Sequence, residues 1–404
     1  MRRATAGGSP RTPPATTWEL EHQVQRLLEK ATRGAAEHDM DLPGGPPCAA
    51  SGAEALLAHR GEVIAHHHCG TGVLFAEDGS LLPEDQRSAI AEGQLWDIAS
   101  LTKVVTTLTA LVQVDRGAFD LDSPVSDHLP EFGRGPDGGA SPGARRRVRI
   151  RHLLNHTSGL PAVARPWTVD GSRAERAAYL LRLPLDHDPG TAHVYSCVGY
   201  MTLGLLLERV TGQGLPELIS ETVTGPLGMA STAYSPAADR TVTATEYDTT
   251  TGRGLVRREV HDEAAAALGG AGNAGLFSDA HDLLLLAEEI RTGRTGLLTE
   301  QSRALLSAGT LSAAEVTRLG YDQAAGLRLG QQAFMGTEHP AVLGHTGFVG
   351  TSLVVDPRHD LVAVLLTNTV HPRRGAFTVM PLRRALAEAG RAWAESHRRA
   401  EDQV

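Results

Sequence analysis

Residues 100–114 read SLTKVVTTLTALVQV, and the rest of the fold can be worked outward from this stretch. Apolar side chains such as Leu101, Val104 and Leu108 return every three or four residues, the spacing that places them on one side of an α-helix. Gly117 follows and ends the predicted helix. We therefore predict a core helix that buries one apolar stripe.

Strands are predicted on both sides of this helix, near the two ends of the chain. Residues 53–59 and 63–69 are typical of a hairpin, and residues 351–356 and 361–368 of a second strand pair. Strands that are distant in sequence can share one sheet. We expect an α/β (α+β) fold whose sheet is built from both chain ends and flanked by helices.

Further helices are predicted over 18–38, 172–183, 198–211 and 379–398, and another is expected to be capped by Ser278. The Gly- and Pro-rich segment 133–147 is predicted to be an exposed, mobile loop, with Arg145, Arg146 and Arg147 in solvent. The predicted organisation is a flexible N-terminal tail (1–17), an α/β domain (18–117 plus 271–404) and an inserted, mostly helical domain (118–270).

Composition excludes several classes of protein. The net charge of −9 over 404 residues disfavours nucleic-acid binding, and no apolar run reaches the roughly 20 residues that span a bilayer. Three cysteines, Cys48, Cys69 and Cys197, suggest no disulfide framework. Residues 1–17 lack the apolar segment of a signal peptide, so we expect a cytoplasmic protein without nucleic-acid or membrane partners.

Lysine is scarce, and one lysine stands three residues after a serine. The chain contains only Lys30 and Lys103, and Ser100 and Lys103 would lie on one face of the predicted helix. A serine hydroxyl becomes a nucleophile when a neighbour accepts its proton, which a neutral lysine can do. The competing interpretation is a chance spacing.

Two further segments carry candidate chemistry. Tyr195 precedes a predicted helix, and a nearby cation would favour its phenolate, although a core tyrosine with a satisfied hydroxyl is the simpler alternative. The segment His345–Gly350 (HTGFVG) contains two glycines at a strand start, where the backbone could approach a ligand closely. An ordinary glycine turn is the alternative there.

Together, these motifs resemble those of the serine hydrolase superfamily of class C β-lactamases, penicillin-recognising DD-peptidases and related esterases and transacylases. The phrases that carry the resemblance are WDIA (96–99), SLTK (100–103), LLNHTSGLP (153–161), YSC (195–197), PLGM (226–229), GNAGLFSDAHD (272–282) and HTG (345–347). The resemblance spans roughly residues 50–390. It implies an antiparallel sheet flanked by helices, with an inserted helical domain.

The resemblance also implies roles for individual residues. Ser100 matches the nucleophile, and Lys103 and Tyr195 match the pair that moves its proton. The backbone N–H groups of Ser100 and Phe348 match the oxyanion hole. The substrate-binding positions are Cys197, His345, Thr346 and Gly347.

One position departs from the family pattern. The tyrosine motif usually ends in asparagine, whose amide grips the substrate, but here it ends in Cys197, whose thiol hydrogen-bonds weakly. This departure disfavours β-lactam or peptide recognition more than it disfavours acyl transfer. We expect an intracellular ester, amide or thioester substrate.

Other polar clusters have simpler interpretations. His66 and His68 share one side of a strand, but two histidines do not complete a metal site, and we expect neither metal nor cofactor. The segment His261–Glu263 could line a cleft or form a surface turn. Cys197 could itself be a nucleophile, although free cysteines are more often inert.

Three functions are compatible with the sequence. The first is a serine hydrolase that cleaves an ester or amide of a small acyl substrate through an acyl-enzyme on Ser100. The second is an acyltransferase that passes the acyl group to an amine or alcohol in secondary metabolism. The third is a non-catalytic relative that keeps the fold. The sequence leaves the substrate and the oligomeric state open.

Overall fold

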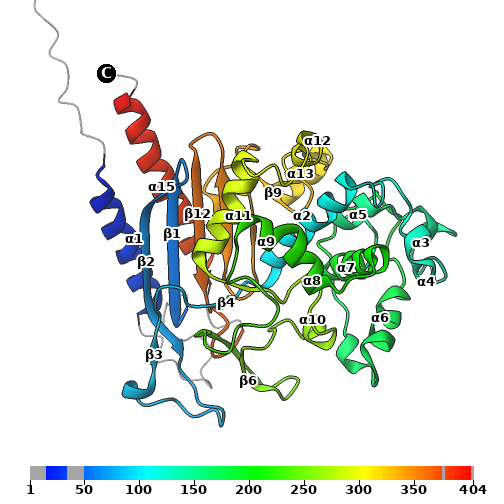
Figure 1. Cartoon of the computed structure of the whole chain (residues 1–404), viewed down its shortest axis with the longest axis horizontal. Helices are drawn as coiled ribbons and strands as arrows, with labels where there is room; N and C mark the ends of the chain where they lie inside the picture. The colour runs from blue at the N-terminus through cyan, green and yellow to red at the C-terminus, as the bar shows by residue number, and fades with distance from the viewer. Residues whose placement is uncertain (1–14, 34–49, 375–377, 402–404) are drawn as a thin grey trace, which may run out of the picture.

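One antiparallel sheet joins the two ends of the chain in the computed structural model, which describes residues 15–33, 50–374 and 378–401 (Figure 1). Its strands, in order across the sheet, are β3 (Ser88–Ala89), β2 (Glu62–Val73), β1 (Gly52–His59), β12 (Leu361–Thr367), β11 (Ser352–Asp356), β10 (Leu343–Thr346), β9 (Arg328–Leu329) and β8 (Asp322–Gln323). The first long strand, β1, pairs with the last, β12, with Ala53 opposite Thr367. The predicted sheet built from both chain ends is confirmed.

Both faces of this sheet are buried. In β12, Val362, Val364 and Leu366 pack into one hydrophobic core. Their neighbours Leu361, Ala363 and Leu365 pack into a second core on the opposite face. Side chains alternate between faces along a strand, so a continuous apolar run is what a sheet covered on both sides requires.

Helices cover each face of the sheet. The terminal helices α1 (Thr17–Thr32) and α15 (Met380–Glu401) lie against the outer face, and α11 (Ala280–Thr292) lies against the other (Figure 1). Helix α2 (Thr102–Asp115) follows a short 3₁₀ turn (Ala99–Leu101) and packs into the core on the same side as α11. These layers agree with the predicted α/β (α+β) architecture.

The remaining helices lie mostly between α2 and α11 in the chain. They are α3 (Val125–His128), α4 (Pro130–Gly133), α5 (Ile150–Leu154), α6 (Arg173–Leu181), α7 (Cys197–Thr211), α8 (Leu215–Ile219), α9 (Gly225–Leu227), α10 (Glu263–Ala267), α12 (Glu300–Ala304), α13 (Ala313–Leu319) and α14 (Gln332–Met335). Two small sheets accompany them, β4 (Trp96–Asp97) with β7 (Phe277–Ser278) and β5 (Ala244–Asp248) with β6 (Gly254–Arg257). The predicted insertion over 118–270 thus contains a hairpin besides its helices, and its boundaries stay a prediction.

The predicted helix over 100–114 is present, but it is buried on more than one side. Every residue from Thr102 to Gln113 is buried, threonines included. Two of the hydroxyls donate to carbonyls: Thr106 Oγ1 to Gly272 O and Thr107 Oγ1 to Lys103 O, at 2.9 and 2.8 Å. Satisfied hydroxyls let the polar face of the helix enter the core, which the apolar stripe alone did not indicate.

Other boundaries differ from the prediction by small, explicable amounts. Helix α1 begins at Thr17 and ends at Thr32, before the predicted His38, and most of the predicted tail (1–14) lies outside the described residues. The cap of α11 is Asp279, which accepts from Asp282 N, and not Ser278, which pairs in β7.

Arg145 corrects the prediction of a wholly solvated loop over 133–147. Its side chain is buried, and the guanidinium donates to the carbonyls of Phe132, Leu181 and Leu183. A guanidinium can enter the interior when carbonyl acceptors surround it, at a cost in solvation: burial lowers the pKa of Arg145 to about 10. Arg145 therefore anchors this segment. Within the described residues, no helix combines the length and apolarity needed to cross a bilayer.

Candidate active site

Ser100 follows a strained turn at the end of β4. Ala99 has a φ of +46°, a left-handed conformation that is costly for a residue with a Cβ. Its N–H donates to Asp97 Oδ1 at 2.7 Å, while Asp97 Oδ2 accepts the His261 N–H at 2.8 Å. Burial raises the pKa of Asp97, and these two backbone donors oppose that shift. The Asp97 carboxyl thereby holds the turn that presents Ser100 ahead of α2.

Lys103 reaches back one helical turn to Ser100. Its Nζ lies 2.9 Å from Ser100 Oγ and donates to Asn273 O at 2.8 Å. Cys197 Sγ lies 3.6 Å from the same nitrogen. The side chain is fully buried, and the rings of Tyr195 and Tyr200 lie 5.0 and 5.8 Å from Nζ. The predicted spacing of Ser100 and Lys103 does place their reactive atoms in contact.

Opposing effects act on the pKa of Lys103, and its neutral form stays a prediction of the sequence analysis. Burial lowers its pKa, but negative charge on Cys197 and Tyr195 raises it, and the net pKa lies above the ordinary lysine value. Lys103 therefore rests as an ammonium when either neighbour is anionic. Lys103 Nζ thus lies in contact with Ser100 Oγ and Cys197 Sγ and near the ring of Tyr195, where it can take part in moving the Ser100 proton.

His156, in the sequence segment 153–161, holds Tyr195 in place. The two rings are 4.5 Å apart, His156 O accepts the Val194 N–H, and His156 Nδ1 accepts the Ser196 N–H. Burial, followed by the charge of Lys103, lowers the pKa of His156 well below its ordinary value, so it stays neutral and can accept this bond. The segment 153–161 thus positions the segment that carries Tyr195 and Cys197.

The segment after β10 closes the site from the other side. Arg383 Nη2 donates to Gly347 O at 2.7 Å and Gly347 N donates to Thr351 O at 2.7 Å, which fixes the turn before Phe348. Thr351 Oγ1 in turn donates to Ile98 O, two residues before Ser100. These bonds hold the Gly347–Phe348 backbone beside the nucleophile.

These elements surround a cavity of about 520 Å³. Its lining combines the predicted residues Ser100, Tyr195, Cys197, Thr346, Gly347 and Phe348 with Ala99, Ala162, Val163, His261, Asp262, Glu263, Ala274, Arg328, Arg374 and Arg383. Lys103 lies beneath Ser100, out of solvent. The segment 261–263 therefore lines a cleft, one of its two predicted interpretations.

His345 is the predicted binding residue that does not line this cavity. Its side chain is buried, and its Nδ1 contacts Thr346 O at 2.9 Å. Burial, followed by the charges of Arg328 and Lys103, lowers the pKa of His345 well below its ordinary value. The side chain is thus a neutral part of the wall behind Tyr195, whose ring lies 5.9 Å away.

Three arginines that the sequence analysis did not single out line the cavity. Arg374 pairs with Glu246 and Glu263 at 2.6 and 2.7 Å, so its charge is neutralised. Arg328 and Arg383 have no carboxylate partner among the described residues, and the Nε of each is buried without an acceptor there. Arginine is common in this chain, so no local pattern could have marked these three.

The sheet, its covering helices and the cluster of Ser100, Lys103 and Tyr195 are of the type found in the β-lactamase and penicillin-binding-protein family of serine hydrolases. The chain belongs to the Beta-lactamase family, whose model matches residues 33–387. The recognition of this family from the sequence is confirmed.

Relatives and solved structures agree with this assignment. The chain is 32% identical over 324 residues, 73% of either chain, to a protein of Escherichia coli (strain K12) named "Putative D-alanyl-D-alanine carboxypeptidase". It is 32% identical over 304 residues, covering 69% of this chain and 68% of the relative, to "N-acetylmuramyl-L-alanine amidase" of Bacillus subtilis (strain 168).

The fold is similar to that of "EstCE1, a hydrolase with promiscuous acyltransferase activity" (TM-score 0.70, 23% identity, 91% of this chain and 99% of that one). It is also similar to a simvastatin synthase variant of Aspergillus terreus (TM-score 0.68, 19% identity, 94% and 96%). At these identities the two structures support the fold alone.

Proposed function

We propose that the protein is a serine hydrolase that cleaves an ester or amide through an acyl-enzyme on Ser100. The observation that carries the proposal is the contact of 2.9 Å between Lys103 Nζ and Ser100 Oγ at the edge of an open cavity. Burying the Lys103 ammonium beside the Ser100 hydroxyl costs solvation energy. A role in proton transfer explains why the protein keeps this costly arrangement.

The proton movements follow from the charges around Lys103. Tyr195, as a phenolate stabilised by the Lys103 ammonium, accepts the Ser100 proton while Oγ bonds to the substrate carbonyl carbon. The carbonyl oxygen becomes an anion, and the backbone N–H groups of Ser100 and Phe348 are the donors proposed for it. Collapse of this intermediate breaks the bond to the leaving group, which takes the proton from Tyr195.

Water completes the reaction. It loses a proton to Tyr195 as its oxygen attacks the acyl carbon, and the Ser100 ester bond breaks. Ser100 Oγ takes this proton back from Tyr195 as the ester bond breaks, and the acid product leaves. Lys103 remains the counter-charge throughout, so no step leaves an uncompensated anion in the buried part of the site.

The cavity wall indicates which substrates fit. Val163 and Phe348 are 73% and 58% exposed, large values for apolar side chains, and both line the cavity. Arg328 supplies a cation without a carboxylate partner in the described part of the chain. We propose an acyl compound with an apolar portion at the rim and a carboxylate or other negative group facing Arg328.

Acyl transfer is the second candidate function. The exposed apolar rim formed by Val163 and Phe348 gives an amine or alcohol acceptor a surface on which to bind while the acyl-enzyme persists. The structural neighbour EstCE1 is described as a hydrolase with promiscuous acyltransferase activity. Product analysis with and without an added amine separates the candidates, because free acid as the sole product in every case contradicts transfer.

The hydrolase proposal is tested by turnover of p-nitrophenyl esters of graded acyl length, each neutral or carrying a terminal carboxylate. Ser100→Ala should lower the rate at least about 1,000-fold, as loss of a nucleophile does. Ser307→Ala, at an exposed serine, is the matched control and should keep the wild-type rate. Equal turnover by wild type and Ser100→Ala would overturn the proposal. The predicted cytoplasmic location and absence of macromolecular partners stay predictions.

A further inference from the structure

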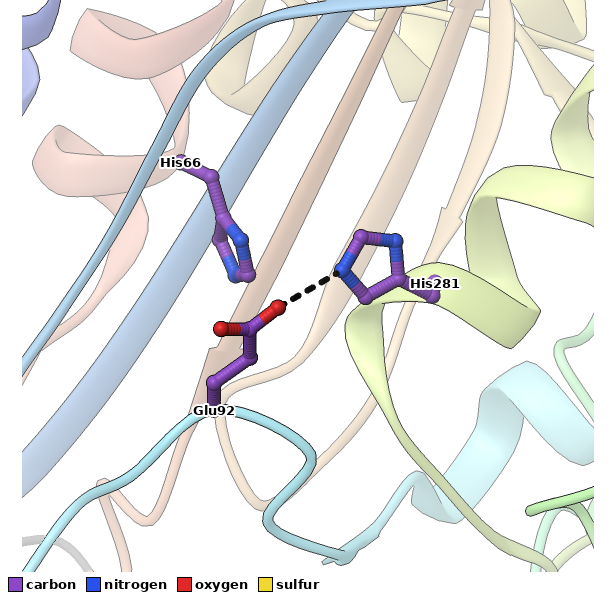
Figure 2. Close-up of side chains that lie close together, drawn as sticks. All are labelled: His66, Glu92 and His281. Carbon is purple, nitrogen blue, oxygen red and sulfur yellow. Dashed lines mark ion pairs between the residues drawn. The ribbon is translucent and has the colours of Figure 1, made fainter.

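Three polar side chains from distant parts of the chain meet outside the catalytic cavity. His66 lies on β2, Glu92 in the loop between β3 and β4, and His281 in the first turn of α11 (Figure 2). One donor atom of each lies within 4.8 Å of those of the other two. None of the three lines the cavity around Ser100, so the proposed reaction gives them no role.

Their spacing is close to that of a metal site. His281 Nε2 and Glu92 Oε1 lie 3.6 Å apart, and the dashed line in Figure 2 marks this pair. In tetrahedral zinc sites with bonds of about 2.0–2.1 Å, neighbouring ligand atoms are about 3.3 Å apart. The side chains of His281 and Glu92 are 48% and 71% exposed, so rotation about their own bonds can close the remaining gap.

The buried carboxylate of Glu54 fixes the orientation of the His66 ring. This contact is a second, independent sign of a ligand site. Glu54 is 1% exposed and its Oε1 accepts from His66 Nε2 at 2.9 Å. Its Oε2 accepts from Trp96 Nε1 at 2.8 Å, so both oxygens have partners. With the proton on Nε2, neutral His66 keeps a lone pair on Nδ1. Ligating histidines of zinc sites usually donate their other ring N–H to a carboxylate in this way.

The backbones that carry the other two ligands are also fixed. Arg240 Nη2 donates to Gly93 O at 2.6 Å and contacts Asp279 Oδ2 at 3.2 Å. One contact holds the loop of Glu92, and the other ties that loop to the residue that caps α11, two positions before His281. Asp279 also balances the charge of Arg240 near the cluster.

We propose that His66, Glu92 and His281 bind a Zn²⁺ ion, with His66 Nδ1, His281 Nε2 and a Glu92 oxygen as ligands and water in the fourth position. Two imidazoles and one carboxylate are a donor set that zinc favours, whereas Mg²⁺ and Ca²⁺ favour oxygen ligands throughout. The strand pattern places His66 and His68 on one side of β2, and only the folded chain brings Glu92 and His281 to His66.

The ion would stabilise the part of the chain that leads to Ser100. It would join β2, the loop before β4 and α11, and Glu54 connects the site to Trp96, four residues before Ser100. The inference does not depend on the proposed hydrolase activity, since its test measures metal binding and thermal stability.

The test is a calorimetric titration of the EDTA-treated full chain with ZnCl₂, with thermal unfolding followed in parallel. Wild type should bind one Zn²⁺ at this site in the micromolar range or tighter, and zinc should raise its melting temperature. His281→Ala and Glu92→Gln, both at exposed side chains, should weaken this binding at least tenfold. Glu54→Gln, which touches no metal, should weaken it about 10- to 100-fold.

His67→Ala is the matched control, because His67 lies on the same strand but faces the opposite side. It should bind zinc as the wild type does, which separates this site from binding by scattered histidines. The proposal is overturned if wild type binds no zinc in the micromolar range. It is equally overturned if His281→Ala and wild type bind with the same affinity and show the same thermal shift.

Discussion

Gly347 lies so close to Ile98 that a Cβ at position 347 would stand 2.7 Å from the Ile98 carbonyl oxygen. The same Cβ would stand 2.0 Å from Thr351 Oγ1, which itself donates to that carbonyl. The segment His345–Gly347 (HTG) therefore packs directly on the segment that leads to Ser100. Glycine is required here by close approach and not by an unusual backbone conformation.

Gly347→Ala should consequently impair both stability and activity. The added methyl group has to displace backbone of the nucleophile's segment, and overpacking of this kind costs about 1–3 kcal/mol. Gly199→Ala in α7 is the control, because its Cβ would have ordinary contacts, the nearest at 3.6 Å. Chemical denaturation and ester turnover check the pair. Equal stability and turnover of the two variants would contradict this close packing.

Lys103→Met should lower the rate of Ser100 acylation about 100- to 10,000-fold, the range of a lost proton-transfer group. Methionine fills a similar volume but removes the positive charge that stabilises the anionic neighbours of Ser100. The chain provides its own control, since Lys30→Met changes the only other lysine, which is exposed on α1. Single-turnover kinetics with an activated ester measure the effect, and a Lys103→Met variant as fast as Lys30→Met would refute the role of Lys103.

Alkylation of Cys197 should block the cavity. The thiol lines the cavity and lies 3.6 Å from Lys103 Nζ, so a reagent that enters the cavity reaches it beside the nucleophile. N-ethylmaleimide should therefore inactivate the wild type at a rate that an occupying substrate slows. Cys197→Ser should retain activity and resist the reagent.

Cys69→Ser separates this effect from reaction at another thiol. Cys69 is half-buried, its Sγ contacts Thr32 Oγ1 at 3.4 Å, and burial raises its pKa. The Cys69→Ser variant should lose activity to the reagent as fast as the wild type does. If Cys197→Ser were inactivated as quickly, the inhibition would come from elsewhere and Cys197 would not line the working site.

Stability should fall with pH below about 6.5, because buried histidines are held neutral. Burial lowers the pKa of His371 to about 3, and the pKa values of His156 and His345 also lie well below the ordinary value. Between the folded and unfolded pKa values, the unfolded chain binds more protons, so unfolding becomes easier as pH falls. Each such histidine contributes up to about 1.4 kcal/mol per pH unit.

Denaturation between pH 5.5 and 7 checks this prediction above the ordinary carboxyl pKa of 4.5, near which the unfolded chain begins to protonate Glu246, whose folded pKa is about 2. His371→Gln should flatten the slope, since it removes one of the buried imidazoles whose pKa folding lowers. His22→Gln, at a partly exposed histidine on α1, should leave the slope unchanged. A wild-type stability that is constant over this pH range would contradict the neutral, buried state of these histidines.

Much of the fold follows from local pattern. The hairpin near the N-terminus and the strand pair near the C-terminus were predictable because β-branched and apolar runs of strand length end at Gly- and Asp-containing turns. Satisfaction of polar groups by distant carbonyls was not predictable. Burial of Thr106 and of Arg145 depends on carbonyls from other elements, which no periodicity reveals.

The candidate site likewise has contacts that the sequence predicts and properties that it does not predict. Ser100 and Lys103 are one helical turn apart, so their contact could be inferred from spacing. The charge state of Lys103 could not, because it depends on Tyr195 and Cys197, which the fold brings from more than ninety residues away. Arg328 stands in the two-residue strand β9, beside the edge strand β8, with no motif around it.

The central claim is that Ser100 is the acyl-accepting nucleophile, and intact-protein mass spectrometry with peptide mapping tests it most directly. After reaction with a fluorophosphonate, the wild type and Ser307→Ala should each gain the mass of one adduct, mapped to Ser100. Ser100→Ala should gain none. An adduct mapped to Cys197 or another residue, or labelling of Ser100→Ala at the wild-type rate, would contradict the account.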